Sequence, residues 1–338
     1  MRKFEALSAL LRKVGDRIGW SWIGMAFSAA VVAGSLFVLY ELLRHIDIER
    51  VFAAIHATPT RSVVTASLFV AAGYITMTLY DYFALRTIGR REVPYRTAAF
   101  AAFTSYTIGH NLGATVLTGG AVRLRIYSAW GLGVVDVAKI AFITGLTFWL
   151  GNVFVLSFAL TYAPEAAPAL TMLPPWAIRW LGLGGFLAIA GYIGWLLPRP
   201  RTVGRASWRI ALPDARLTLV QIGIGILDFA AGSLAFYMLM PSTPAVGFVV
   251  VTVAFVSATL LGFVSHAPGS LGIFDAAMLL SLTQFEKEDL LASLLIFRFV
   301  YFVAPFAVAV VILGVRELSL AHRTRLCAVV GAQRTPPA

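Results

Sequence analysis

The sequence predicts an all-α, polytopic membrane protein with about seven to eight spans and two re-entrant segments broken by glycine and proline. Hydrophobic residues make up 59% of the 338 residues, and charged residues only 13%. Many apolar stretches reach about twenty residues, enough to cross ~30 Å of hydrocarbon. Two others are broken by glycine or proline, which membrane-depth backbone tolerates only where protein or a water-filled cavity satisfies it.

The net charge of +11 falls in short basic clusters between the apolar spans. This distribution is typical of cytoplasmic loops and of attraction to anionic headgroups, so we expect no nucleic-acid binding. The single cysteine, Cys327, excludes a disulfide within the chain and a multi-cysteine metal site. We therefore expect neither a metal nor another cofactor.

Residues 1–22 alternate basic and apolar side chains, which predicts an amphipathic helix on the cytoplasmic membrane surface. A frayed basic tail is the alternative. The first apolar stretch, 23–43, lacks a signal-peptide cleavage site and is predicted to be a retained span. An integral membrane domain over 23–315 and a basic cytoplasmic tail over 316–338 complete the predicted organisation.

Arginine-rich loops give the predicted orientation. The loop 86–96 holds four arginines and one glutamate, and the loop 198–216 holds five arginines and one aspartate. Both should be cytoplasmic by the positive-inside rule. The loop 163–176 carries one acid and no base, as expected on the external side. The spans around these loops are predicted at 62–85, 137–162 and 177–197.

The two arginine-rich loops must be separated by an even number of crossings. A full span over 97–117 would give three, so we expect residues 97–127 to enter from the cytoplasmic side and return. Four glycines interrupt this stretch. Arg123 and Arg125 would then lie on or just inside the cytoplasmic face.

The second half contains another broken segment. Spans are predicted at 217–240, 246–265 and 290–313. Pro268, Gly269 and Gly272 interrupt the apolar sequence between the last two spans. Only residues 273–283 remain before the next polar stretch, and at ~1.5 Å per residue they are too short to cross. One broken segment in each half favours a transport site between repeats, although no residue-by-residue repeat is evident.

Four stretches resemble the lysylphosphatidylglycerol synthase transmembrane-domain family, which includes the flippase half of the multiple peptide resistance factor. These are YDYFALRTIGRREVPYR, GHNLGATVLTGGAVRLRIYSAWGL, the Phe148-Trp149 pair and HAPGSLGIFDA. The resemblance, over residues 20–315, implies a bacterial inner-membrane protein that binds or translocates phospholipid, in the best-studied members an aminoacylated phosphatidylglycerol. We expect the soluble lipid-synthesising domain of those members to be absent. The lipid is therefore left open, with isoprenoid and hopanoid types among the candidates.

Arg123, Arg125 and Tyr127 follow Gly119 and Gly120 directly. The planar fork of arginine matches phosphate oxygens, and glycine backbone can approach a headgroup closely and offer amide donors. The alternative is a positive anchor at the membrane face. We favour headgroup contact because the glycines come immediately before the arginines.

Three other candidates lie in or near the first broken segment. His110 and Asn111 can donate to a headgroup or satisfy freed backbone groups, and we favour the second role. Asp81 can pair with an arginine at the interface, such as Arg86, or attract a cationic headgroup. Both interpretations of Asp81 remain open.

Asp228 and Arg298 lie deep in predicted spans, where a charge costs several kcal/mol and usually marks function or a buried partner. A structural pair between them is one alternative, and a role in transport is the other. His266, Gly269 and Ser270 precede a half-helix whose positive end would favour a phosphate inside the membrane. A tightly packed turn is the alternative for that loop.

No catalytic constellation is evident in the sequence. Asp275 suits the first turn of the half-helix as a cap, so we do not expect it to bind ligand. GSLG is not the serine elbow of a hydrolase, five scattered histidines give no HExxH pair, and no glycine-rich loop carries a Walker lysine. We therefore do not expect an enzyme.

The leading hypothesis is a phospholipid flippase or lipid-translocating inner-membrane protein with both termini cytoplasmic, acting on an anionic or aminoacylated phospholipid. Two alternatives remain open. One is an intramembrane enzyme acting on lipid phosphate or isoprenoid substrates through His266 or His110 with an aspartate. The other is a scaffold for a separately encoded lipid-modifying enzyme. Expected partners are phospholipid headgroups, with that enzyme and a second copy of the chain as further candidates.

Overall fold

The computed structural model describes residues 40–41, 43–44, 46–113, 115–164, 173–198, 201–204, 209–265 and 268–332. The predicted surface helix at 1–22, nearly all of the predicted span at 23–43 and His266 lie outside the described residues. The part that is described is helical apart from one small hairpin, in which β1 (Thr202–Val203) pairs antiparallel with β2 (Ile210–Ala211).

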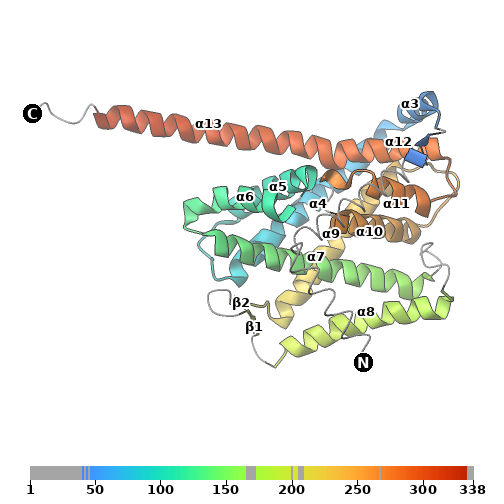
Figure 1. The fold of residues 1–338 in the computed structure, drawn as a ribbon, viewed down its shortest axis with the longest axis horizontal. Coiled ribbons are helices and arrows are strands. Elements are labelled where there is room, and N and C mark those ends of the chain that lie inside the picture. The colour runs from blue at the N-terminus through green and yellow to red at the C-terminus, as the bar shows by residue number, and fades with distance from the viewer. Residues whose placement is uncertain are drawn as a thin grey trace, which may run out of the picture.

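The helices form a bundle in which most run in roughly one direction and two, drawn in blue to cyan and in yellow, cross them obliquely (Figure 1). In chain order they are α3 (Ile48–Ala57), α4 (Thr60–Thr87), α5 (Tyr95–Leu112), α6 (Thr115–Tyr127), the 3₁₀ turn η1 (Ser128–Trp130), α7 (Val134–Tyr162), α8 (Pro175–Leu196), α9 (Ala215–Leu239), α10 (Phe248–Ser265), the 3₁₀ turn η4 (Pro268–Ser270), α11 (Ile273–Ser281), α12 (Lys287–Arg298), the π-helical turn η5 (Phe299–Val303) and α13 (Ala304–Ala332). Six candidate membrane spans occur among the described residues, the last formed by 287–316. The all-α polytopic fold class is therefore confirmed.

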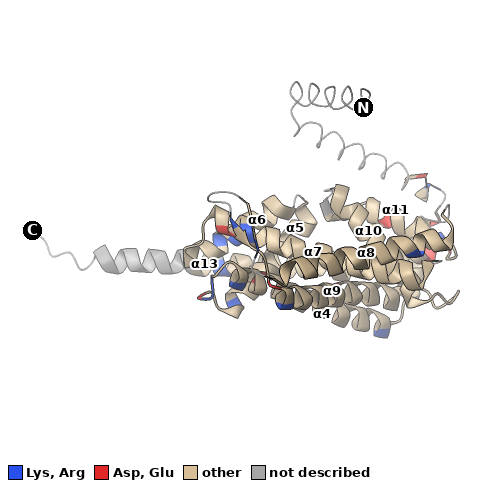
Figure 2. Ribbon diagram, turned by 90° about the horizontal axis from the view of Figure 1, so that it is seen from below, with Lys and Arg blue, Asp and Glu red and all other residues tan. Residues whose placement is uncertain are grey.

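Positively charged residues gather at one end of the bundle (Figure 2). We call it the basic end and define it by residues 86–96, 128–133, 201–204 and 209–216. The other end, called the opposite end, contains α3 and residues 240–247 and 282–289. Because α4 ends and α9 begins at the basic end, these two central helices pack antiparallel.

Two helical hairpins enter the bundle from opposite ends (Figure 1). α5 begins and α6 ends near the basic end, where Ala98 and Tyr127 share a buried cluster with Leu85. α10 begins and α11 ends at the opposite end, where Val251 and Leu282 belong to the same cluster as Leu239. The two predicted re-entrant segments are thus present as hairpins, and the predicted span at 246–265 forms the first arm of the second one.

Glycines with positive φ break the chain at both hairpin tips. Gly113 follows α5 with φ 75° and ψ −177°, a conformation that is essentially restricted to glycine. Gly269 and Gly272 have φ values of 58° and 80° between α10 and α11. The sequence located both breaks correctly because glycine adopts positive φ without steric cost, although Ser270 in the second tip also has a positive φ of 50°.

The two tips meet beside the last long helix, which is formed by α12, η5 and α13, about half-way along its candidate membrane span at 287–316. Asn111, at the first tip, donates from Nδ2 to the carbonyl oxygen of Phe302 at 3.3 Å. Arg298, one turn before Phe302, donates from Nη1 to the carbonyl oxygen of Gly269 at 3.0 Å in the second tip. Arg298 ends the 12-residue α12, so it lies about 18 Å from the start of that helix, compared with ~30 Å for the thickness of a hydrocarbon core.

The order of elements in the two halves is the same, but their directions are opposed. α4, the α5–α6 hairpin and α7 correspond to α9, the α10–α11 hairpin and the helix from α12 to α13. Inverted arrangements of this kind place binding sites near the membrane midplane in transporters. α7 crosses α9 closely at Gly151 and Gly225. There is no room for a side chain there, since a Cβ on Gly151 would lie 2.7 Å from the Cα of Gly225.

Candidate functional site

A buried ion pair joins the first hairpin to α4. Arg123 of α6 donates from Nε to Oδ2 of Asp81 at 2.9 Å and from Nη2 to Oδ1 at 2.8 Å, a bidentate geometry. The Asp81 and Arg123 side chains are 0% and 4% exposed. The Tyr127 hydroxyl also donates to Oδ2 of Asp81 at 2.9 Å, and the Arg123 guanidinium lies 4.7 Å from the centre of the Tyr106 ring. This geometry makes the pair an anchor between α6 and α4.

The structure therefore places Arg123 in an ion pair and not in an open recess. The predicted contact of Arg123 with a headgroup would require the guanidinium to leave Asp81. Of the two interpretations of Asp81, pairing with an arginine is the one observed, but its partner is Arg123. Arg86, the nearby interface arginine, instead stacks 4.5 Å from the centre of the Tyr82 ring.

A second ion pair holds the second hairpin to the last long helix. Arg298 donates from Nε to Oδ1 of Asp275 at 2.7 Å and from Nη2 to Oδ2 at 2.6 Å. It also donates to the carbonyl oxygens of Gly269 at 3.0 Å and Ser270 at 3.4 Å. The side chains of Arg298 and Asp275 are 13% and 10% exposed, so this pair is more accessible than the first.

This second pair bears on two expectations from the sequence. The alternative that Arg298 pairs with Asp228 is wrong, because the tip loop brings Asp275 to the guanidinium. Asp275 does cap its helix, since Oδ2 accepts a hydrogen bond from the Gly272 amide at 3.1 Å. The predicted cap is thus confirmed, but the sequence does not show that a capping carboxylate can also face the next helix.

Asp228 lies in the interior between α9 and α4. Its residue is 7% exposed, and its Oδ2 accepts a hydrogen bond from the Tyr80 hydroxyl at 3.0 Å. Gly73 of α4 faces the same carboxyl group, since a Cβ at this position would be in ordinary van der Waals contact with Oδ1 of Asp228, at 3.8 Å. A carboxyl group at this depth is expensive to maintain and is a candidate for function.

Polar side chains continue from Asp228 along α9 towards the basic end. Gln221 and Thr218 are 1% and 0% exposed, and Asn152 of α7 is 0% exposed near the same crossing. Among the described residues, both amide atoms of Gln221, Oδ1 of Asn152 and Oγ1 of Thr218 have no hydrogen-bond partner within the protein. Buried polar atoms of this kind are usually satisfied by internal water, so this stripe is suited to hold water.

The remaining predicted residues have separate roles. Asn111 donates to the carbonyl oxygens of Thr107 at 2.8 Å and Phe302 at 3.3 Å, so it satisfies backbone groups as favoured from the sequence. The ring of His110 lies 5.8 Å from that of Tyr106. A Cβ on Gly119 would lie 2.9 Å from the carbonyl oxygen of Ser105, so this glycine allows α6 to pack on α5.

Gly120 and Arg125 are less enclosed. A Cβ at Gly120 would meet no heavy atom within 4 Å. Arg125 is exposed near the basic end of α6. Both positions fit the expectation that part of this helix faces the membrane surface.

The predicted residues thus form three groups rather than one basic recess. Asp81, Arg123 and Tyr127 lie towards the basic end, Asn111, Gly269, Ser270 and Arg298 lie where the hairpin tips meet, and Asp228 lies between α4 and α9. Sequence reasoning missed Tyr80 and Gln221, and it named Asp275 only as a helix cap. Their shared signal is a polar side chain inside an apolar segment, which identifies a buried group but not its partner.

Together these features define a class: a multi-pass membrane protein with two inverted helical hairpins and deeply buried Asp–Arg pairs. No family model matches the chain. It is similar to Inner membrane protein YbhN of Escherichia coli, with 24% identity over 288 residues that cover 84% of this chain and 88% of that protein. It is also 28% identical over 302 residues to an uncharacterized protein of Synechocystis sp., covering 88% and 92% of the two chains. The apolar helices and the first similarity support a multi-pass protein of the inner membrane.

Proposed function

We propose that this chain is a lipid-translocating inner-membrane protein, a phospholipid flippase for an anionic or aminoacylated phospholipid. The observation that carries the proposal is the meeting of two broken hairpins, from opposite ends, about half-way through the bundle. Irregular backbone at that depth is characteristic of transport sites between inverted repeats. The resemblance to the lysylphosphatidylglycerol synthase transmembrane-domain family is the reason that we propose a phospholipid as the transported molecule.

Arg298 is the residue that we propose contacts the lipid phosphate. A guanidinium binds phosphate and carboxylate with the same planar fork, so an arriving phosphate can replace Asp275. That exchange would also loosen the bonds from Arg298 to the carbonyl oxygens of Gly269 and Ser270. The tip of the second hairpin would then be free to move, while the buried ion pair of Asp81 and Arg123 keeps the first hairpin fixed.

Asp228 and the polar stripe beside it would provide the hydrated interior that a charged headgroup needs. Its carboxylate would be the natural contact for a cationic part of the headgroup, because the carboxylate of Asp81 is already held by Arg123. No covalent step is involved, so we propose a transporter and not an enzyme.

The proposal also sets an orientation and partners. By the positive-inside rule the basic end would face the cytoplasm, and we propose that both termini lie on that side. Phospholipid headgroups would be the direct partners. A separately encoded lipid-modifying enzyme and a second copy of the chain are further proposed partners.

The test is the movement of a fluorescent phospholipid between leaflets of liposomes that contain the purified chain. Arg298→Lys keeps the charge but removes the fork, so we expect slower lipid movement. Arg179→Lys, an exposed arginine of α8, is the matched control and should leave the rate unchanged. If the unaltered chain moves lipid no faster than protein-free liposomes across several headgroups, the proposal is wrong.

A further inference from the structure

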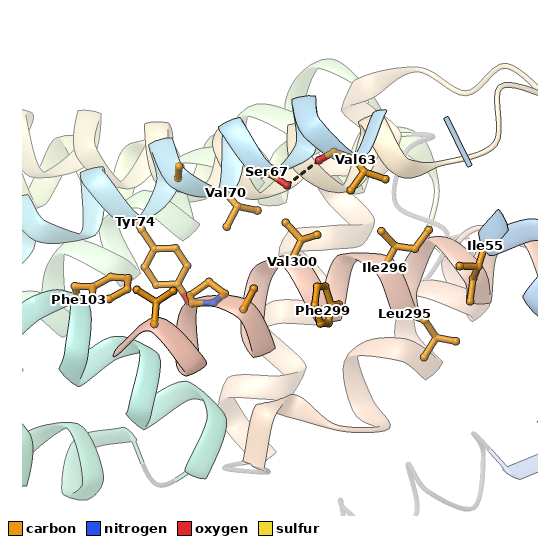
Figure 3. Close-up of a pocket in the computed structure, with 14 residues that line it drawn as sticks. Ile55, Val63, Ser67, Val70, Tyr74, Phe103, Leu295, Ile296, Phe299 and Val300 are labelled. Carbon is orange, nitrogen blue, oxygen red and sulfur yellow. Dashed lines mark hydrogen bonds between the residues drawn. The ribbon is translucent and has the colours of Figure 1, made fainter. Parts of the chain in front are cut away.

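An apolar groove runs between α4 and the last long helix. Its cavity has a volume of about 660 Å³. Figure 3 shows side chains of α4 along one side and those of α12, η5 and α13 along the other, with Ile55 of α3 at one extremity and Phe103 of α5 near the other. The groove therefore extends from the opposite end of the bundle towards the depth at which the hairpin tips meet.

The lining of this groove is suited to hydrocarbon. Only two of its side chains carry polar atoms, and both donate to backbone carbonyls: Ser67 to Val63 at 2.8 Å and Tyr74 to Tyr301 at 3.0 Å. Phe299, which also lines the groove, is 60% exposed. Because it lies in a membrane-spanning part of the chain and opens outwards, the groove can receive an acyl chain from the bilayer.

A charged cavity of about 370 Å³ lies at the opposite end, between α3 and the start of α12. It is lined by Arg50, Ala53, Ala54 and Ala57 of α3 and by Glu286, Glu288 and Asp289 at the start of α12. Ile296, which lines the groove, is seven residues after Asp289, about 10 Å further along the helix. One amphiphile can therefore reach both cavities, with its charged part in the charged cavity and its apolar part in the groove.

We propose that the groove and the charged cavity are the two parts of one binding site for phosphatidylethanolamine. The acyl chain would lie in the groove. The primary ammonium group would donate to the carboxylates, and Arg50 would bind the phosphate. Arg50 remains accessible for this, because its side chain is 76% exposed and its Nε lies 3.6 Å from Asp47.

The arrangement of charge selects this headgroup. Three carboxylates face one guanidinium, so a wholly anionic headgroup such as phosphatidylglycerol is disfavoured. Both signs of charge line one small cavity, so the ligand must hold its phosphate and its amine close together, as ethanolamine does. The inference goes beyond the proposed function, because it assigns a zwitterionic phospholipid to a site at the opposite end, separate from the anionic or aminoacylated lipid proposed for translocation.

Binding can be measured without any transport. The purified full chain in detergent would be mixed with equal amounts of phosphatidylethanolamine, phosphatidylcholine and phosphatidylglycerol, and the retained lipid identified by native mass spectrometry. Phosphatidylcholine has the same charges but lacks N–H donors, so we expect about tenfold preference for phosphatidylethanolamine, the size of one charge-assisted hydrogen bond.

Two variants with matched controls locate the site. Glu288→Gln combined with Asp289→Asn should remove the preference among headgroups, whereas Glu49→Gln, an exposed acid of α3 outside the cavity, should keep it. Ala71→Trp should fill the groove and reduce retention of every lipid. Ala72→Trp, an exposed position outside the groove on the same helix, should not. Unchanged thermal unfolding midpoints would show that each variant still folds.

Equal retention of the three lipids, or preference for phosphatidylglycerol, would overturn the inference. So would normal retention in Ala71→Trp, the result expected if residues 23–43 of the chain occupy the groove. Because the assay does not involve translocation, a chain that binds selectively but moves no lipid would refute only the proposed function. A chain that moves lipid without this selectivity would refute only the inference.

Discussion

Arg123 shows how a single charge can be kept inside this bundle. The guanidinium has a bidentate carboxylate partner in Asp81, and Tyr127 gives that carboxylate a further donor. Because both side chains are at most 4% exposed, neither charge can be rehydrated without opening the helices. Such a pair makes the loss of one partner much more costly than the loss of both.

Asp81→Asn should therefore destabilise the protein by about 3–5 kcal/mol, because it leaves the Arg123 charge buried without an anion. The measurement is the unfolding free energy or thermal midpoint in detergent. The double variant Asp81→Leu, Arg123→Met removes both charges and should recover most of the loss. If the double variant is as unstable as the single one, the pair is not the cause.

Two adjacent glycines of α6 give an independent test of packing. Gly119→Ala should destabilise by about 1–3 kcal/mol, because the new Cβ would lie 2.9 Å from the backbone carbonyl oxygen of Ser105. Gly120→Ala meets nothing within 4 Å and should be neutral or stabilising by up to about 1 kcal/mol through helix propensity. Equal thermal midpoints for the two variants would contradict the close packing of α6 on α5.

At this scale the sequence identified buried charges but not their partners. Asp228 and Arg298 stood out because each interrupts an apolar span. The partner of Arg123 is 42 residues away and that of Arg298 is 23 residues away, so each pairing depends on how the hairpins fold back. Spacing along one helix contains no information about such contacts.

At the scale of elements, the hairpins followed from two kinds of reasoning. The even number of crossings between arginine-rich loops predicted the first hairpin, and the short apolar stretch after Gly272 predicted the return arm of the second. The depth of α10 was not predictable, because 18 residues are long enough for a span. Packing decides it: the ring of Phe263 lies 5.1 Å from that of Phe148, about half-way along α7.

The break between α5 and α6 should depend on Gly113. Its φ of 75° with ψ of −177° is essentially restricted to glycine, so Gly113→Ala should cost about 1–3 kcal/mol of unfolding free energy. Gly145→Ala in the interior of α7, where a Cβ meets nothing within 4 Å, is the control and should not destabilise. A thermal midpoint for Gly113→Ala equal to that of the unaltered chain would argue against the broken tip.

At the scale of the molecule, the two halves form an inverted pair that composition and periodicity did not reveal. The relation lies in the order and direction of helices, while the side chains differ. Asp81 of α4 pairs with α6 in the first half, whereas Arg298 of α12 pairs with α11 in the second. Since the equivalent contacts use different residues on different helices, comparison of the two halves residue by residue could not detect it.

The two hairpins should enter the membrane from opposite sides, and side-specific labelling of single cysteines tests this directly. Single cysteines at Ser242, Gln284 and Arg91, in a Cys327→Ser background, would be exposed to a membrane-impermeant thiol reagent in sealed vesicles. All three positions are exposed, outside the helical arms. Ser242→Cys and Gln284→Cys should be labelled from one side, and Arg91→Cys only from the other. Labelling of the first two from different sides would show that the second hairpin crosses the membrane and would contradict the account.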